Sequence, residues 1–223
     1  MKDVIRLLTL FAALLLIVPA AGADWSENFD SYAAGSGLHG QGGWEVWGGN
    51  LDYDAFITDS YSRSAPNSVA IVDTTDIVQL FTETTGEWEM TAWCYIPTSS
   101  TGNTYFIMLN RYPTSPSWSV QITFDTDAGT LSTQGGSTAA IVFDQWVEVK
   151  VEIYLDANSK NLYYNSGFLE SNIWQSGGVD EIAALDLFST TIGSIAYWDD
   201  CNLINTGGAL EQTTWGNIKT ITQ

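Results

Sequence analysis

The stretch WVEVKVEIYLD, residues 146–156, has the clearest periodic pattern in the chain. Its valine, isoleucine and leucine side chains alternate with glutamate, lysine and tyrosine, so the two sets point in opposite directions. A period of two residues is typical of a β-strand that has one face in the core. The polar run DANSKN at 156–161 predicts a hairpin turn, and residues 162–165 begin the return strand. This stretch therefore predicts antiparallel sheet.

Strand patterns recur along most of the chain. In residues 88–96 the side chains of Trp88, Met90, Ala92 and Cys94 share one face, and Pro97 ends the run. Glycine, serine, threonine and asparagine separate the segments at short spacing, which is typical of a sandwich or jelly roll. We predict an all-β fold, a two-sheet antiparallel β-sandwich. Further strands are expected at residues 27–32, 55–59, 68–72, 77–82, 105–111, 117–124, 130–134, 182–189 and 195–204.

The first residues have the features of a secretory signal peptide. Lys2 and Arg6 precede an apolar run at 7–18, and an A-x-A pattern ends at Ala23. We expect cleavage near Ala23 and a secreted protein, extracellular or periplasmic. No later stretch reaches the roughly 18 apolar residues of a membrane span. The predicted organisation is a signal peptide at 1–23, a jelly-roll domain at 24–206 and a tail at 207–223 that is compatible with one short helix.

Charge and cysteine content restrict the function classes. The chain has 26 acidic and 7 basic residues, a formal net charge of −19. This balance argues against nucleic acid and anionic membranes, which attract basic patches. It fits either a solvating acidic surface or carboxylates that bind Ca²⁺. Two cysteines in an exported protein form one disulfide or stay as two buried thiols, and the residues alone leave both alternatives open.

Five segments together resemble a known family. They are ENFDSYAAGSGLHGQGGW at 27–44, SAPNSVAIV at 64–72, GEWEMTAWCYIP at 86–97, DQWVEVKVEIYLD at 144–156 and AYWDDCNLI at 196–204. In order and spacing they resemble secreted bacterial concanavalin A-like, laminin-G-like jelly-roll domains. The resemblance covers residues 27–204 and implies that the first and last strands lie side by side. The fold serves lectins, glycosidases, lyases and adhesion modules, so it implies little about function.

The catalytic patterns of this fold are missing from the sequence. Laminarinase-type hydrolases resemble E-x-D-x-E, but Glu87 and Glu89 are followed by Thr91, and Lys150 takes the place of the aspartate between Glu148 and Glu152. Alginate-lyase relatives use a Gln-x-His, whereas the single histidine here lies in the N-terminal glycine-rich loop. We therefore do not expect an enzyme, and a polysaccharide-degrading glycosidase or lyase is the less favoured alternative.

The resemblance implies a structural calcium ion between the first and last strands. The matching residues are Glu27 and Asp30 on the first strand with Asp199 or Asp200 on the last. In the alternative interpretation, Asp200 faces solvent, while Asp199 caps backbone amides or pairs with an arginine. Strand parity predicts that Asp199 points inward and Asp200 outward.

The same parity predicts that Cys201 points inward with Asp199, and Cys94 also lies on a face predicted to be inward. The resemblance implies that the strands carrying the two cysteines are neighbours. It therefore predicts a disulfide between Cys94 and Cys201.

Aromatic residues supply the remaining functional signal, because sugars stack on exposed rings while amides and carboxylates bind their hydroxyls. We predict a carbohydrate-binding or adhesion module whose partner is a polysaccharide or cell-surface glycan. The alternative is an extracellular structural protein that binds another protein. For each ligand-binding candidate, packing in the core is the competing role. The candidates are Tyr105, Asn110, Arg111, Tyr112, Trp118 and Trp174.

Overall fold

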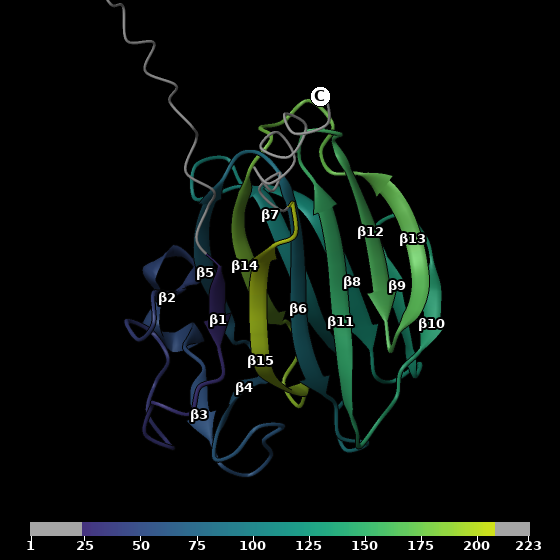
Figure 1. Ribbon diagram of the computed structural model, residues 1–223. Helices are drawn as coiled ribbons and strands as arrows, with labels where there is room; N and C mark the ends of the chain where they lie inside the picture. Colours follow the sequence, from purple (N-terminus) through teal and green to yellow (C-terminus); the bar gives the residue numbers. More distant parts are fainter. Residues whose placement is uncertain (1–23, 208–223) are drawn as a thin grey trace, which may run out of the picture.

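The computed structural model describes residues 24–207 as two antiparallel β-sheets packed face to face (Figure 1). Two short 3-10 helices, η1 (Trp47–Gly49) and η2 (Leu51–Tyr53), follow the second strand. The strands are β1 (Trp25–Glu27), β2 (Trp44–Val46), β3 (Phe56–Thr58), β4 (Ser68–Val72), β5 (Asp76–Glu83), β6 (Glu87–Tyr95), β7 (Asn103–Arg111), β8 (Ser117–Asp125), β9 (Thr130–Thr133), β10 (Thr138–Ala140), β11 (Trp146–Tyr154), β12 (Ser159–Tyr164), β13 (Gly167–Ile173), β14 (Ile182–Ser189) and β15 (Ile195–Asn205).

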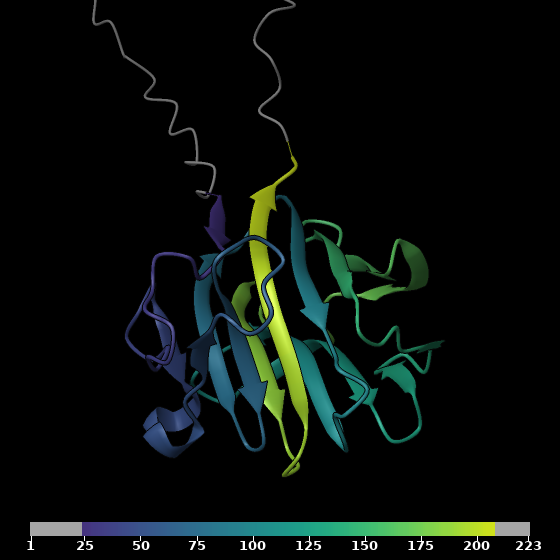
Figure 2. The same ribbon diagram turned by 90° about the horizontal axis from the view of Figure 1, so that it is seen from below.

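The two sheets confirm the predicted sandwich. One sheet, called here the β15 sheet, has the order β13-β12-β11-β6-β15-β4-β3, with β1 paired to β15. The other, the β14 sheet, has the order β10-β9-β8-β7-β14-β5-β2. The β15 sheet faces the viewer in Figure 1, and the β14 sheet lies behind it. Figure 2 shows the purple β1 beside the yellow β15, so the first and last strands are neighbours.

The core fills the space between the sheets because alternate residues of each strand point into it. On β11, Val147, Val149, Val151 and Ile153 are buried, as the alternation predicts. Burying an apolar side chain of this size contributes about 1.5–3 kcal/mol relative to leaving it exposed. The largest buried side chains include Trp44, Trp88, Trp174, Trp198, Phe106 and Phe124.

A β-bulge at Asp200 changes the parity of the last strand. Asp200 has a φ of 45°, and the pairing of β15 with β6 shifts between Asp199 and Asn202. Upstream of the bulge it is Trp198 that points into the core, with its ring 5.6 Å from that of Phe106. The prediction that Asp199 points inward is therefore wrong, although Cys201 beyond the bulge does point inward. Asp199 is buried on the outer face, beneath the loop between β3 and β4.

The predicted disulfide is also wrong, since Cys94 and Cys201 are free and buried. The two strands are neighbours, but Cys94 lies opposite Trp198, and Cys201 lies opposite Glu27 of β1. The bulge leaves Cys201 about two positions along the strand from Cys94. Strand spacing and rise then place their Cα atoms roughly 8 Å apart, beyond the range that a disulfide spans.

The first strand differs from the predicted one in its position. The first strand is Trp25–Glu27 and not residues 27–32, because the chain turns at Phe29, whose φ is 59°. The predicted signal peptide at 1–23 and the tail lie outside the described residues, apart from Gly207. Within residues 24–207, neither short helix is long and apolar enough to span a membrane.

Candidate functional site

A groove runs across the outer face of the β14 sheet, on the far side in the view of Figure 1. Its central compartment has a volume of about 340 Å³ and is lined by four aromatic rings, those of Trp47, Tyr105, Trp118 and Phe188. Asp76, Ile107, Gln121 and Asp186 complete the lining.

Two further compartments adjoin the central one. One, of about 300 Å³, shares Asp76 and Phe188 with it. The other, of about 350 Å³, shares Trp118 and lies where the groove reaches the edge of the sandwich, because β12 and β13 of the β15 sheet supply part of its lining. These three adjoining compartments are called the groove below. An extended groove of this kind fits a chain-like ligand better than a single small molecule.

The strand alternation explains why these side chains face outward. On β14, Leu185 and Leu187 point into the core, so Asp186 and Phe188 point away from it. Antiparallel pairing then aligns the strands: Phe188 lies opposite Asp76 of β5 and Tyr105 of β7. In the next row Asp186 lies opposite Ile107, which lies opposite Gln121 of β8. Residues far apart in the sequence thus form one floor.

Asp76 and Asp186 form a carboxyl pair on that floor. Asp186 is only 3 % exposed, and no donor among the described residues hydrogen-bonds to the Oδ1 atom of either side chain. Burial raises the pKa of Asp76 to about 7, although hydrogen bonding to Asp186 partly opposes this. Burial, the charge of Asp76 and a hydrogen bond with Asp76 raise the pKa of Asp186 well above its usual range. The pair therefore holds at least one proton at neutral pH.

The aromatic rings form the walls of the groove. Trp47, on η1, packs edge-on against Tyr112 with 4.8 Å between ring centroids, and it stacks at 20° on Trp118 with 6.4 Å between centroids. Tyr105 and Phe188 stack at 5.3 Å on the floor. Trp118 is 42 % exposed. Its face is available to a ligand.

The predicted ligand residues divide into two groups. Tyr105 and Trp118 line the central compartment, and Tyr112 packs beside it against Trp47. Trp174 borders the flanking compartment that shares Trp118, although its side chain is almost fully buried. Trp174, Asn110 and Arg111 all have structural contacts. The guanidinium of Arg111 donates a hydrogen bond to the carbonyl of Ser115 at 2.7 Å. Asn110 is buried, and its side-chain amide donates to the carbonyl of Val179 at 3.3 Å. Trp174 is a core residue that is 1 % exposed, and its indole N–H donates to the carbonyl of Glu181 at 2.9 Å.

Sequence reasoning singled out only Tyr105 and Trp118 in the central compartment, and it missed the residues that give the floor its carboxyls and the wall its second tryptophan, namely Asp76, Asp186 and Trp47 among others. A signal was present for Asp186, because an aspartate within the apolar strand IAALDLFS is unusual. No local signal pointed to Asp76 or Trp47, which reach the groove only through the pairing of β5 and β2 within the sheet.

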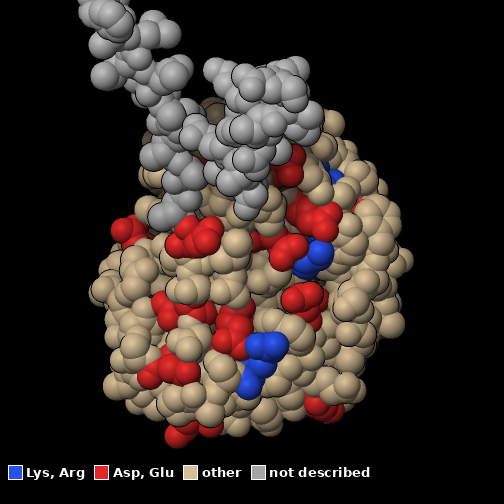
Figure 3. Space-filling view, viewed as in Figure 1, with Lys and Arg blue, Asp and Glu red and all other residues tan. Residues whose placement is uncertain are grey.

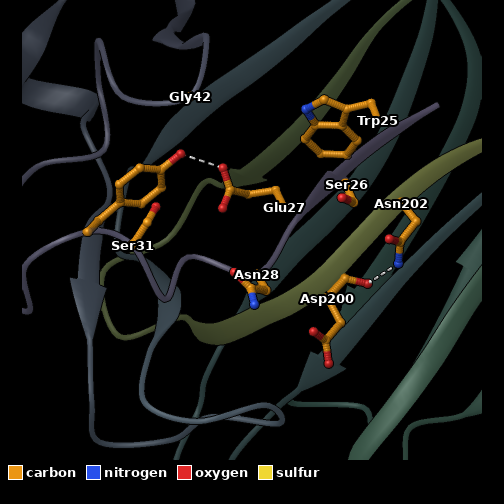
Figure 4. Close-up of a pocket in the computed structure, with 9 residues that line it drawn as sticks. Trp25, Ser26, Glu27, Asn28, Ser31, Gly42, Asp200 and Asn202 are labelled. Atoms are coloured by element: carbon orange, nitrogen blue, oxygen red, sulfur yellow. Dashed lines mark hydrogen bonds between the residues drawn. The ribbon is translucent and has the colours of Figure 1, made fainter. Parts of the chain in front are cut away.

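The predicted calcium ligands lie near the pairing of β1 with β15, and two of them share a cavity. Glu27 and Asp200 line a cavity of about 630 Å³ together with Trp25 and Asn202 (Figure 4). Figure 4 shows the carboxylate of Glu27 turned toward a tyrosine hydroxyl, which belongs to Tyr32, and away from Asp200. Asp30 accepts a hydrogen bond from the backbone of Asn67 at 3.0 Å.

Asp199 takes no part in that cavity. Its carboxylate accepts hydrogen bonds from the backbone amides of Arg63, at 2.7 Å, and Ser64, at 3.0 Å, which is the alternative role for Asp199 given above. Burial raises its pKa to about 6 against the opposing effect of these bonds. Asp200 forms an ion pair with the Arg63 side chain.

The four predicted ligands are thus not brought together. Within residues 24–207 no group of three or more histidine, cysteine or acidic side chains is placed to hold a metal ion. Calcium binding stays a prediction that titration calorimetry would test.

The outer face of the β15 sheet carries the carboxylates that were compared with glycosidase patterns. Lys150 lies between them, 2.8 Å from Glu152 and 3.3 Å from Glu89. Burial opposes ionisation of Glu152, but hydrogen bonds from Lys150, Asn161 and Tyr163 outweigh it and lower its pKa to about 2. Figure 3 shows acidic side chains spread over this face with few basic ones among them. A carboxylate held ionised in this way is a poor general acid.

Comparisons with known proteins support the fold. No protein-family model matches the sequence, and no curated protein does. Among solved structures, a sialidase matches with a TM-score of 0.57 and 9 % identity over 82 % of this chain and 18 % of that one. The endo-β-1,4-glucuronan lyase of the fungus Trichoderma reesei matches with a TM-score of 0.54 and 7 % identity over 82 % of this chain and 95 % of that one. The chain therefore spans about a fifth of the sialidase and nearly all of the lyase.

These likenesses show a concanavalin A-like jelly roll, a fold shared by carbohydrate-binding modules, lectin domains and polysaccharide lyases. At such low identity they establish the fold alone.

Proposed function

We propose that this protein is a non-catalytic carbohydrate-binding module that holds a glycan in the groove of the β14 sheet. One observation supports the proposal most directly. Exposed and half-buried aromatic rings flank buried carboxyl groups whose Oδ1 atoms have no hydrogen-bond donor among the described residues. Rings stack on the apolar faces of sugars, and carboxyl oxygens accept hydrogen bonds from sugar hydroxyls.

The arrangement of the carboxyl pair favours binding over hydrolysis. Burial raises the pKa of both Asp76 and Asp186, so neither is held as the ionised carboxylate that a retaining glycosidase uses as its nucleophile. The central compartment also has no histidine in its lining within the described part of the chain. A glycosidase or lyase remains the less favoured alternative.

The experiment is a glycan array followed by calorimetry with the glycans that bind. The Trp118→Ala variant should bind at least tenfold more weakly, because losing one stacked ring removes about 1.5–3 kcal/mol of burial. Phe168→Ala is the matched control, since Phe168 is 59 % exposed, packs against Tyr163 and lines none of the three compartments. Equal weakening in both variants would contradict the proposed site. An array with no binding, combined with capture of a protein, would favour the alternative of a protein-binding surface module.

The proposal also includes export, with secretion to an extracellular or periplasmic location, and membership among the secreted bacterial laminin-G-like modules. Its support is the basic start, the apolar run and the A-x-A pattern of residues 1–23. N-terminal sequencing of the exported protein should begin at or near Asp24. A mature protein that retains Met1 would contradict export by this route.

A further inference from the structure

We infer that the groove selects neutral glycans and disfavours acidic sugars such as uronates and sialates. The inference rests on the proposed function, because it names the class of glycan that the same groove takes. Its basis is the distribution of hydrogen-bond acceptors and charges along the groove.

The floor presents oxygen atoms that need donors from a ligand. Asp186 is more than nine-tenths buried. Its Oδ1 atom accepts no hydrogen bond from the described residues, and neither does the Oδ1 atom of Asp76. The flanking compartments repeat the feature, since the hydroxyls of Ser189 and Ser119 are buried there with no partner in residues 24–207. A buried polar atom left unpaired is unfavourable by itself. Sugar hydroxyls donate hydrogen bonds and would satisfy these atoms.

The central compartment offers nothing that would hold an anion. Within the described part of the chain, none of the residues that line it is lysine or arginine. Glu45 of β2 extends the central row on the same face, because it lies opposite Val78, which in turn lies opposite Asp186. A carboxylate on the ligand would lose hydration in this compartment and would find no cationic partner among the residues that line it.

The two nearest cations are turned to backbone carbonyls. Lys160 lines the flanking compartment of Trp118, but it is buried and its amine donates to the carbonyl of Ser119. Glu170 lines the same compartment and offsets that charge. Arg111 donates to Ser115, as described above. Recognition of carboxylates normally uses an arginine fork, and Arg111 lines none of the three compartments.

Matched oligosaccharides test the inference. Cellohexaose and the β-1,4-glucuronan hexamer share linkage and length and differ by a carboxylate at each C6, and β-1,4-mannohexaose and the β-1,4-mannuronan hexamer form a second such pair. In calorimetry at pH 7, the neutral oligosaccharide of each pair should bind at least tenfold more tightly than the acidic one. The neutral glycans of the array should likewise bind more tightly than the acidic glycans.

The Asp76→Asn/Asp186→Asn double variant should reduce the ratio of neutral to acidic oligosaccharide affinity at least threefold. The Glu87→Gln/Asp156→Asn double variant, which removes two exposed carboxylates away from the groove, should leave it unchanged. Circular dichroism checks that each variant is folded. If a variant does not fold, the affinities of the wild-type protein for the neutral and acidic oligosaccharides still test the inference.

The outcomes separate the two proposals. Binding of acidic glycans as tightly as neutral ones, or more tightly, would overturn the selectivity and leave the proposed function standing. If the control variant reduced the ratio of neutral to acidic affinity as much as the Asp76/Asp186 variant does, the selectivity would come from the net charge of the protein. That result would overturn the role of the groove. The absence of any glycan binding would overturn the proposed function, and the selectivity with it.

Discussion

Asp76 and Asp186 meet on the outer face of the β14 sheet although 110 positions separate them in the sequence. Phe188, two residues after Asp186 on β14, lies directly opposite Asp76 on β5, so the two carboxyls are diagonal neighbours. Burial there raises the pKa of both. Such groups destabilise the folded state when they ionise, which makes the pair visible in stability measurements.

The stability of the protein should fall as pH rises through the titration of this pair. An unfolded aspartate titrates near pH 4, whereas folded Asp76 has a pKa of about 7. Between these values the folded state binds more protons, so its contribution is complete below about pH 4 and is lost as pH rises to about 7. Asp186 extends the loss above pH 7, since its pKa is raised well above the usual range.

Urea unfolding at pH 5, 6, 7 and 8 measures this slope, to which each carboxyl of the pair contributes at most about 1.4 kcal/mol per pH unit. The Asp76→Asn/Asp186→Asn variant should have a shallower slope than the wild type. Asp199, whose pKa is raised to about 6, acts in the same direction in both proteins and cancels from the comparison. Identical slopes would show that the pair does not titrate in this window.

Both cysteines should be free thiols that react only after unfolding. They are buried, and burial raises the pKa of each thiol. Mass spectrometry of unreduced protein treated with iodoacetamide should show no alkylation in the folded state and two adducts in urea. Prior reduction serves as the control and should not change the count. If the unreduced protein takes up no iodoacetamide in urea, the two cysteines are joined in a disulfide and this prediction is wrong.

Asp199 should anchor the loop that follows β3. Replacing it with alanine leaves the amides of Arg63 and Ser64 without their acceptor, and each unpaired group costs about 1–3 kcal/mol. We expect Asp199→Ala to lower the free energy of unfolding by about 2–5 kcal/mol. Asp200→Ala should cost less than 1 kcal/mol, because its ion pair with Arg63 is partly exposed. Equal effects of the two variants would contradict the anchoring role.

The bulge at Asp200 predicts which neighbouring aromatic residue supports the core. Trp198 is fully buried, whereas Tyr197 packs on the outer face with its ring 4.8 Å from that of Tyr61. Trp198→Ala should cost about 3–5 kcal/mol of stability. Tyr197→Ala should cost clearly less in the same denaturation experiment, and Trp198→Phe gives a milder variant if the alanine protein does not fold. The reverse order would mean that β15 has the parity that its sequence suggests.

The aromatic wall should act as a unit. Trp47 and Trp118 stack on each other over one face of the sheet, although β5, β14 and β7 lie between β2 and β8, so removing one ring changes how the other is presented. In a double-mutant cycle of glycan binding, Trp47→Ala and Trp118→Ala should show a coupling of about 0.5–1.5 kcal/mol. Additive losses would indicate that the two rings contact the ligand separately.

Local sequence patterns by themselves determined the sandwich. The alternation in residues 146–154 places four side chains in the core, and it does so through backbone geometry that needs no distant partner. Tyr105 and Trp118 were predicted as ligand residues from the chemistry of their rings, with packing in the core as the competing role. The structure places both rings in the lining of the groove.

Only the tertiary structure decided where the carboxylates lie. One extra residue at Asp200 reverses the faces of β15 upstream, which moves Asp199 out of the core, and the register of β15 with β6 leaves Cys201 out of reach of Cys94. Asp76 and Asp186 become a pair solely because β5 and β14 are neighbours in the sheet order. A bulge and a strand order depend on long-range pairing, and no local period records them.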